Sequence, residues 1–335
     1  MKLAIVILNW NGKKLLEEFL PSVIMHSTGA EIYVADNAST DSSVDFVKTY
    51  HPQVKIVQNT VNGGYAKGYN DALQHIDADV YCLLNSDVQV TKNWLVPIIT
   101  EFKNSPNTAV IQPKILDYKK QTHFEYAGAA GGFIDKYGYP FCRGRIFTTL
   151  EEDKGQYDET TEIFWASGAC LFIRKSVFEE AGKLDEDFFA HQEEIDLCWR
   201  IKNLGYSIKY VGNSKVFHLG GATLSSMNPK KTFFNFRNSL YNLVKNVSGS
   251  KVLWIIFIRL ILDGIAGIKF IFEGKFSHFF AILKAHFDFY KNLRVLVNKR
   301  KKRSSMEKYY LISSVIVQYY FFKNIKFDQL IGSNH

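Results

Sequence analysis

The 335-residue sequence predicts an α/β fold, in which a doubly wound, mostly parallel sheet is followed by a C-terminal α-helical extension. In the front of the chain, short continuous apolar runs alternate with helical patterns, which is typical of parallel strands covered on both faces. Behind it, long apolar helical patterns alternate with Lys and Arg. A composition of 47% hydrophobic and 22% charged residues supplies a core and excludes a disordered chain.

The expected strands of the front part are four apolar runs, at residues 3–8, 32–35, 54–57 and 80–84. Helical patterns stand between them and further along, at residues 13–26, 42–50, 65–76 and 192–203. Glycine and aromatic residues crowd the stretch 115–161, so hairpins or a long loop are expected there instead of strand–helix alternation. The four Cys are far apart in the sequence, which predicts free thiols and a reducing cytoplasm. No signal-peptide pattern precedes the first expected strand.

Polar residues follow all four expected strands, at the edge where open α/β sheets bind ligands. The four sets are Asn9-Trp10-Asn11-Gly12, residues 36–42, residues 59–68 and Asn85-Ser86-Asp87. Each set alone is also typical of a turn, but their common placement predicts a binding site. Within the third set, Asn62 and Gly64 belong to a helix start whose backbone N–H groups could face an anion. No Gly-x-Gly-x-x-Gly or P-loop pattern is present, so dinucleotide and P-loop binding lose their main support.

Carboxylates and a histidine are the candidates for chemistry. Asp87 ends a buried strand, where it either caps a turn or holds Mg²⁺ or Mn²⁺ against a diphosphate. Glu193, Glu194 and Asp196 lie at the start of an expected helix, where acids are favoured by the helix dipole and where one could act as general base. Asp196 is expected to pair with a basic residue four positions later. A single histidine at a strand end, such as His218, is more often structural than a ligand.

Seven stretches of the first 240 or so residues resemble the family 2 inverting glycosyltransferases, which have the GT-A fold. They are VILNWNG at 6–12, VADNASTDSS at 34–43, NGGYAKGYNDAL at 62–73, LLNSDVQV at 83–90, WASGACLFIRKSVF at 165–178, LDEDFFAHQEEIDLCWR at 184–200 and GYSIKYVGNSKVFHLGG at 205–221. Within this family, the stretches resemble rhamnosyltransferase-like enzymes that act on cell-surface polysaccharides. The resemblance implies metal-dependent transfer of a hexose or deoxyhexose from a UDP- or dTDP-linked donor to a growing, lipid-linked glycan.

The resemblance also implies roles for single residues on the donor side. Asp36 matches the residue that reads the nucleotide base, and Asn9 and Asn11 match the lining of the same pocket. Asp87 matches the last acid of the metal-binding motif, with Asn85 beside it in the position of the motif's first acid.

On the acceptor side, Glu194 matches the catalytic base, which is usually Asp in the family, and Glu193 and Asp196 are the alternatives. His218 matches the histidine that completes the shell of an Mg²⁺ or Mn²⁺ ion. The wall near the donor sugar and acceptor is implied to be Trp165, Ser167, Gly168 and Ala169.

The charge distribution separates the chain into two parts. From Lys231 onward there are 18 Lys and Arg against 5 Asp and Glu, whereas the first 230 residues hold 23 basic and 28 acidic residues. We expect a catalytic domain at residues 1–232, with a nucleotide-sugar half of about 1–114 and an acceptor half of about 115–232. Residues 233–335 are expected to form a helical, basic region.

Residues 252–272 of this region are apolar but hold three charges, which argues against a membrane-spanning helix. The run 309–322 is uncharged but short, and Lys299 begins a run of five basic residues. Apolar helices beside Lys and Arg favour peripheral attachment to the anionic inner face of the cell membrane. The alternative is a soluble homo-oligomer formed through these helices. Binding to nucleic acid is less favoured, because no nucleic-acid recognition fold accompanies the basic run.

Two alternatives to a glycosyltransferase stay open for the whole protein: an inactive GT-A scaffold and a sugar-phosphate nucleotidyltransferase.

Overall fold

The computed structural model describes residues 1–220, 228–300, 306 and 308–332. The described residues form a nine-stranded central sheet from β1 (Leu3–Asn9), β2 (Glu31–Asp36), β3 (Lys55–Gln58), β4 (Val80–Asn85), β5 (Val88–Val90), β6 (Thr108–Asp117), β11 (Thr160–Glu162), β12 (Cys170–Arg174) and β13 (Ser207–His218). The strand order is β11-β13-β6-β12-β4-β1-β2-β3, and β5 pairs with β13. The helices interleaved with these strands are α1 (Lys13–His26), α2 (Ser43–Tyr50), α3 (Gly64–Leu73), α4 (Leu95–Asn104), α5 (Lys175–Glu180) and α6 (Glu193–Asn203).

The central sheet is mostly parallel and is covered on both faces, as predicted. Strands β1 to β4 run parallel, β6 runs parallel to β13, and β12 is inserted antiparallel between β4 and β6. Alternate residues of β1 enter opposite cores: Ala4 and Val6 pack with α3, α5 and α6, whereas Ile5 and Ile7 pack with α1, α2 and α4. Because both faces are buried, the strand is apolar from Leu3 to Leu8.

The stretch expected to form hairpins does so. It forms a second, antiparallel sheet of β7 (Gly132–Ile134), β8 (Pro140–Cys142), β9 (Arg145–Ile146) and β10 (Thr149–Leu150). The rings of Phe133 and Phe141 pack against Phe327, with centroids 5.1 and 6.3 Å away. This small sheet therefore joins the front of the chain to its C-terminal segment.

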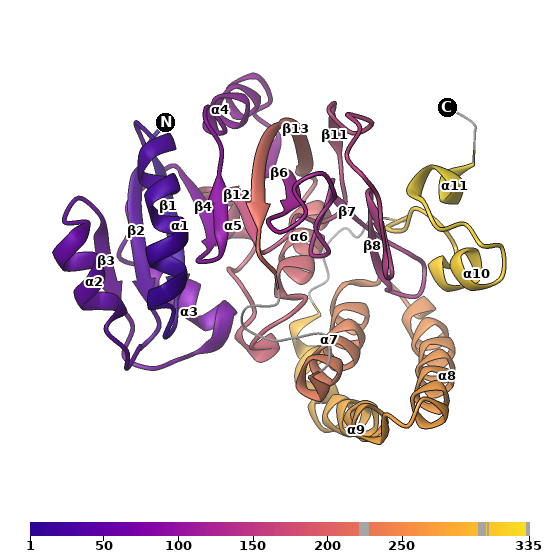
Figure 1. Ribbon diagram of the computed structural model, residues 1–335. Coiled ribbons are helices and arrows are strands. Elements are labelled where there is room, and N and C mark those ends of the chain that lie inside the picture. Colours follow the sequence, from indigo (N-terminus) through magenta and orange to yellow (C-terminus); the bar gives the residue numbers. More distant parts are fainter. Residues whose placement is uncertain (221–227, 301–305, 307, 333–335) are drawn as a thin grey trace.

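The C-terminal extension is helical, as predicted: α7 (Pro229–Asn246), α8 (Lys251–Phe272), α9 (Phe276–Lys299), α10 (Val315–Tyr320) and α11 (Phe327–Ile331). Asn228 caps α7 by accepting a hydrogen bond from the backbone N–H of Lys230 at 2.9 Å, and Pro229 occupies the first turn. Helices α7, α8 and α9 lie at the end of the sheet toward which β13 runs (Figure 1). Of the basic run that begins at Lys299, residues 301–303 lie outside the described residues.

Helix α8 keeps its two central charges inside the protein. Arg259 and Asp263 are 3% and 0% exposed, and Arg259 Nε donates to Asp263 Oδ1 at 2.7 Å. Asp263 Oδ1 also accepts from the hydroxyl of Tyr139 at 3.1 Å, and its other oxygen lies 3.1 Å from His286 Nε2. These contacts tie α8 to β7–β8 and to α9, so each buried charge has partners. Among the described residues, no helix is both long and apolar enough to cross a membrane.

Candidate active site

Strand pairing brings Asp87 and His218 together, although they are 131 residues apart in the chain. His218, the last residue of β13, is in register with Val88 of β5, the residue directly after Asp87. The Oδ1 atom of Asp87 lies 3.1 Å from Nε2 of His218, and both side chains are buried. The backbone N–H of Leu219 donates to the carbonyl oxygen of Asp87 at 3.0 Å and fixes the loop further.

A second carboxylate, which the sequence did not single out, stands on the other side of the histidine ring. The Oε2 atom of Glu125 lies 3.4 Å from Nδ1 of His218, and the same oxygen accepts a hydrogen bond from the backbone N–H of Ala127. Burial alone would lower the pKa of His218, but Asp87 and Glu125 outweigh it and raise this pKa to about 10. The arrangement therefore favours positive charge at this point.

The Asp87–His218 pair fits a divalent metal ion. In an octahedral shell, neighbouring ligand atoms stand about 3 Å apart, which matches the 3.1 Å between Oδ1 and Nε2. Glu125 holds the position, next to the second ring nitrogen, that orients metal-binding histidines in other proteins. Among the described residues, no group of three or more His, Cys, Asp or Glu is placed to hold a metal. The chain thus offers two ligands, and the remaining positions suit diphosphate oxygens or water.

The loops that follow β1 and β2 interlock at the predicted nucleotide pocket. Asn9 Nδ2 donates to Asp36 Oδ1 at 3.2 Å and to Ser43 Oγ at 3.0 Å, and its Oδ1 is buried without a hydrogen-bond partner. The other carboxylate oxygen of Asp36 accepts from the backbone N–H of Ser39 at 3.1 Å. Asn11, at a φ of 50°, accepts from two backbone N–H groups of the second loop with its side-chain oxygen. Both asparagines therefore shape this wall, and Asp36 is held buried within it.

The loop before α3 contacts the loop before α6. Gly64 has a φ of 72°, and a Cβ there would stand 2.4 Å from the carbonyl oxygen of Phe189, so no larger residue fits. Its N–H donates to Asn62 Oδ1 at 3.0 Å, and the N–H of Tyr65 donates to the Phe189 carbonyl at 2.9 Å. Because both N–H groups are used inside the protein, the expectation that they face an anion is not met.

Glu193 and Glu194, hereafter the glutamate pair, begin α6 immediately after a run of left-handed backbone. Burial, and next the charge of Glu194, raise the pKa of Glu193 well above its ordinary value, and its Oε2 is buried without a hydrogen-bond partner. Glu194 is partly exposed, and burial raises its pKa to about 7. Asp196 differs: burial is outweighed by Arg200 and Lys245, both 2.8 Å away, which hold its pKa far below normal. Glu194 is therefore suited to exchange protons near neutrality, whereas Asp196 serves in a buried ion pair.

Tyr65 contacts the backbone of the predicted sugar wall, and the sequence analysis did not identify it. Burial first, and then the charges of Tyr69, Glu193 and Glu194, raise the pKa of Tyr65 well above its ordinary value. Its hydroxyl donates to the Gly168 carbonyl oxygen at 2.7 Å. The next carbonyl, that of Ala169, accepts from the backbone N–H of Asn85 at 2.9 Å. Hydrogen bonds thus tie the predicted sugar wall at 168–169 to Tyr65 of α3 and to Asn85, two residues before Asp87.

The other two residues of that wall have structural contacts. Trp165 is buried, its Nε1 donates to the Phe133 carbonyl oxygen at 2.8 Å, and its ring lies where a Cβ on Gly132 would stand. Ser167 is buried as well, with its hydroxyl donating to the carbonyl oxygen of Ala127. The side chains of Trp165 and Ser167 are therefore engaged in contacts within the protein, so the backbone of Gly168 and Ala169 is what remains of the predicted sugar wall.

Asn238 of α7 holds the loop that carries the glutamate pair. Three residues of this loop have left-handed backbone: Phe189, His191 and Gln192, with φ of 61, 69 and 67°. The Nδ2 of Asn238 donates to the carbonyl oxygens of Phe188, Ala190 and His191, at 3.2, 2.9 and 2.6 Å. Left-handed backbone is costly for such residues and persists where its surroundings hold it, which is the role of the buried Asn238.

Two lysines of the helical extension anchor the beginning of the same loop through ion pairs. Lys299, at the end of α9, lies 2.6 Å from the carboxylates of both Asp185 and Asp187. Lys245 of α7 binds Asp185 and Asp196 from the protein interior. The loop from 185 to 192 is therefore fixed by residues of the helical extension.

Replacing Asn238 by alanine is expected to lower kcat about 10²-fold, because it releases the loop and misplaces the glutamate pair. Binding of the nucleotide, on the far side of the site, should change little. Steady-state kinetics and calorimetry with the free nucleoside diphosphate separate the two effects. Asn235→Ala is the matched control, since Asn235 meets this loop through its backbone carbonyl, which accepts from Gln192 Nε2 at 3.0 Å. Equal losses in both variants, or a loss of nucleotide binding in Asn238→Ala, would contradict the positioning role.

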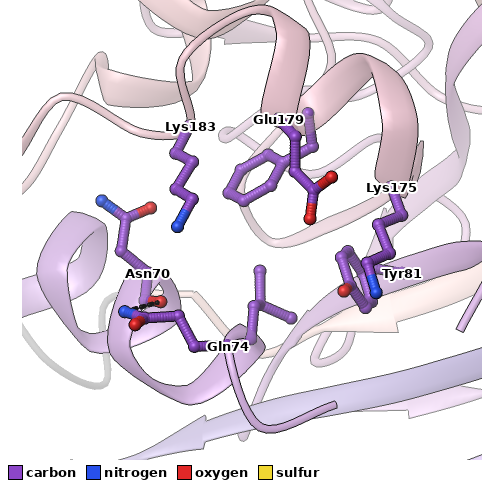
Figure 2. Close-up of a pocket in the computed structure, with 8 residues that line it drawn as sticks. Asn70, Gln74, Tyr81, Lys175, Glu179 and Lys183 are labelled. Carbon is purple, nitrogen blue, oxygen red and sulfur yellow. Dashed lines mark hydrogen bonds between the residues drawn. The ribbon is translucent and has the colours of Figure 1, made fainter. Parts of the chain in front are cut away.

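A cavity of about 220 Å³ lies elsewhere, between α3 and α5. Figure 2 shows its polar side chains: Asn70 and Gln74 from α3, Lys175 and Glu179 from α5, with Lys183 and Tyr81. No residue of the predicted site lines it, so it is separate from the Asp87–His218 site.

Comparison with known proteins agrees with the predicted family and fold. Residues 4–182 match the family model described as glycosyl transferase family 2. The chain is 26% identical over 235 residues to an N-acetylglucosaminyl-diphospho-decaprenol L-rhamnosyltransferase of Mycobacterium tuberculosis (strain CDC 1551 / Oshkosh), covering 64% of this chain and 75% of that protein. It is also 26% identical over 214 residues to the low-salt glycan biosynthesis hexosyltransferase Agl10 of Haloferax volcanii, covering 62% of this chain and 63% of that protein.

Two solved structures have the same fold. S. aureus TarS 1–349 in complex with UDP-GlcNAc superposes with a TM-score of 0.55 at 14% identity, covering 92% of this chain and 93% of that one. GalNAc-T7 with UDP, GalNAc and Mn²⁺ gives a TM-score of 0.56 at 18% identity, covering 73% of this chain and 48% of that one. The central sheet is thus that of the GT-A glycosyltransferases. Because the family model spans more than half of the sequence, the chain belongs to glycosyl transferase family 2 and is a glycosyltransferase.

Proposed function

We propose that this protein transfers a hexose or deoxyhexose from a UDP- or dTDP-linked donor to a hydroxyl of a growing cell-surface glycan, with inversion and with Mg²⁺ or Mn²⁺. The observation that carries the proposal is the contact between Asp87 and His218 at 3.1 Å, at the carboxyl edge of the sheet and with Glu125 behind the histidine. GalNAc-T7 and a mannosyltransferase of Pyrobaculum calidifontis, both similar in fold, were solved with Mn²⁺. These two complexes support a divalent metal ion in the present protein.

Asp87 and His218 would hold the metal ion, which supplies positive charge to offset the charge of the departing diphosphate. Asp36, held by Asn9 and Ser39, marks the place of the nucleoside on the same edge. Asn85 and the backbone of Gly168 and Ala169 form the wall between donor and acceptor. These residues bind and orient the two substrates, which is the larger part of what the protein contributes.

Glu194 takes the proton of the acceptor hydroxyl. The acceptor oxygen forms a bond to the anomeric carbon while the bond between that carbon and the diphosphate oxygen breaks, so the configuration inverts in one displacement. The proton ends on Glu194, and the nucleoside diphosphate leaves. A carboxylate with a pKa of about 7 is matched to this step at neutral pH, because a useful fraction is ionised and the proton is still accepted readily.

The acceptor is proposed to be lipid-linked, and the enzyme to work on the inner face of the cell membrane. The name of the mycobacterial relative states such an acceptor, a diphospho-decaprenol. The excess of Lys and Arg from residue 231 onward suits an anionic lipid surface.

A panel of nucleotide sugars tests the proposal. We expect metal-dependent hydrolysis or transfer with a UDP- or dTDP-sugar, together with calorimetric binding of the matching nucleoside diphosphate in the presence of Mn²⁺. Nucleotide binding without any turnover across the panel and with acceptor present would instead identify an inactive scaffold. Formation of a nucleotide sugar from a sugar phosphate would identify a nucleotidyltransferase.

A further inference from the structure

Helix α8 is oriented with its apolar side toward solvent. Its outward residues are large and apolar, with exposures from 47% for Ile261 to 87% for Phe272. From Trp254 onward they recur every three or four positions, with Leu253 next to the first of them: Leu253, Trp254, Phe257, Ile261, Ile265, Ile268 and Phe272. The two charges of the helix centre, Arg259 and Asp263, face the protein instead. A helix of a water-soluble protein normally has the opposite arrangement.

Helix α9 repeats the pattern beside it. Its outward stripe is Phe276, Phe280, Leu283, Phe287 and Tyr290, each between 48 and 73% exposed. Helices α8 and α9 pack together, since the position of a Cβ on Gly267 is 3.2 Å from the ring of Phe279. The two stripes, hereafter the docking face, expose twelve large apolar side chains on two helices that pack together, and large exposed apolar patches mark interaction sites.

Basic side chains accompany the docking face. Lys251 and Lys269 stand at the two ends of α8, and Lys284, Lys291 and Arg294 follow along α9; all five are exposed. The acidic residues of the two helices are Asp263, which is buried, Asp288, which binds Arg237 and Tyr241, and Glu273, which binds Lys269 and Lys275. Apolar and aromatic side chains with a basic surround are the composition of helices that lie in a membrane interface.

We propose that the docking face inserts into the headgroup region of a bilayer that contains anionic lipid. This inference rests on the proposed function, because a lipid-linked acceptor is offered at such a surface. A second copy of the chain fits less well: in a symmetric dimer the same patch meets itself, so the lysines of one copy would oppose those of the other. An anionic bilayer supplies the opposite charge and an apolar interior, and the lysine side chains can extend from one to the other.

Flotation of the full-length protein with vesicles tests the proposal. We expect binding to phosphatidylcholine vesicles that contain phosphatidylglycerol, weaker binding without phosphatidylglycerol, and weakening by salt. The double variant Ile261→Glu/Ile265→Glu should reduce binding at least about tenfold, since two charges must enter the interface. The matched control is Val96→Glu on α4, an apolar side chain that is 59% exposed far from the docking face. Equal binding of the double variant and wild type would overturn the proposal.

Trp254 reports insertion directly. Brominated lipids should quench its fluorescence, and this quenching should vanish in Trp254→Phe while that variant still floats with vesicles. A wild-type dimer in lipid-free solution that Ile261→Glu/Ile265→Glu dissociates would identify a second copy as the partner and overturn the proposal. An assay of donor hydrolysis without vesicles separates the docking proposal from the proposed function. If the protein hydrolyses the donor but does not bind vesicles, only the docking proposal is refuted. If it binds vesicles but neither hydrolyses nor transfers the sugar, only the proposed function is refuted.

Discussion

Asp87→Asn is expected to lower metal-dependent turnover about 10³-fold, because the charge that holds the cation and faces the departing diphosphate is lost while the side chain keeps its size. The β5–β13 pairing is made by backbone, so the fold should remain and the thermal midpoint should shift little. Electron paramagnetic resonance of Mn²⁺ with the nucleoside diphosphate gives a readout that does not depend on turnover. In the variant, the bound Mn²⁺ signal should weaken along with kcat.

Asp45→Asn is the matched control for this substitution, because Asp45 is an exposed aspartate in the first turn of α2. It should keep both Mn²⁺ binding and turnover. Wild-type turnover in Asp87→Asn, or full activity of the wild-type enzyme after chelation of divalent ions, would refute the metal role.

Glu194→Gln is expected to lower kcat by about 10²- to 10⁴-fold with little change in the KM for the donor, since it removes the acceptor of the proton. In the wild type, kcat should rise with pH up to about 7 and then level off, because burial raises the pKa of Glu194 to about 7 and only the ionised form acts as base. Below that pH the rate should fall about tenfold per unit. Glu194→Gln should flatten this part of the profile. An unchanged kcat would transfer the role to Glu193.

The same group predicts how stability depends on pH. The folded-state pKa of Glu194 lies above its ordinary value of 4.5, so its ionised form is disfavoured by folding. The contribution of Glu194 to the free energy of unfolding is therefore greatest below pH 4.5 and is lost as the pH rises through about 7. Compared with wild type, Glu194→Gln should gain thermal stability between pH 5 and pH 8, which differential scanning calorimetry can measure. A constant difference across this range would contradict a raised pKa.

The parallel sheet could be predicted because its physical signal is local. Strands buried on both faces must be apolar at every position, and the pattern from Lys13 to His26 coincides with α1 at both ends. The contact between Asp87 and His218 followed from the family resemblance and not from the pattern of residues. Their convergence depends on the antiparallel addition of β5 to β13.

Glu125 and Asn238 carried no such local signal. Glu125 reaches the histidine because the chain after β6 turns back, with Leu116 paired to Phe124, in a segment rich in glycine and aromatics. Asn238 is one of several buried polar residues of α7, and its three carbonyl partners lie about 50 positions earlier in the chain. Both contacts are set by tertiary packing, which spacing along the sequence does not encode.

The orientation of α8 shows another limit of pattern reading. Periodicity identifies an apolar side and a charged pair, Arg259 and Asp263, but not which of the two faces the protein. Helices more often bury their apolar side and expose their charges. In α8 the paired charges are buried and the apolar side is exposed. This arrangement depends on Tyr139, from the turn between β7 and β8, and on His286 of α9, both of which contact Asp263.

The anchoring of the 185–192 loop has a practical consequence for dividing the protein. A fragment that stops at residue 232 would include the proposed metal ligands, Asp87 and His218, and the glutamate pair, but lack Asn238, Lys245 and Lys299. Fusing residues 1–232 to a different C-terminal region would have the same effect, because the glutamate pair would lack the residues of α7 and α9 that hold its loop. Engineering of this transferase should accordingly treat α7 and α9 as parts of its catalytic apparatus.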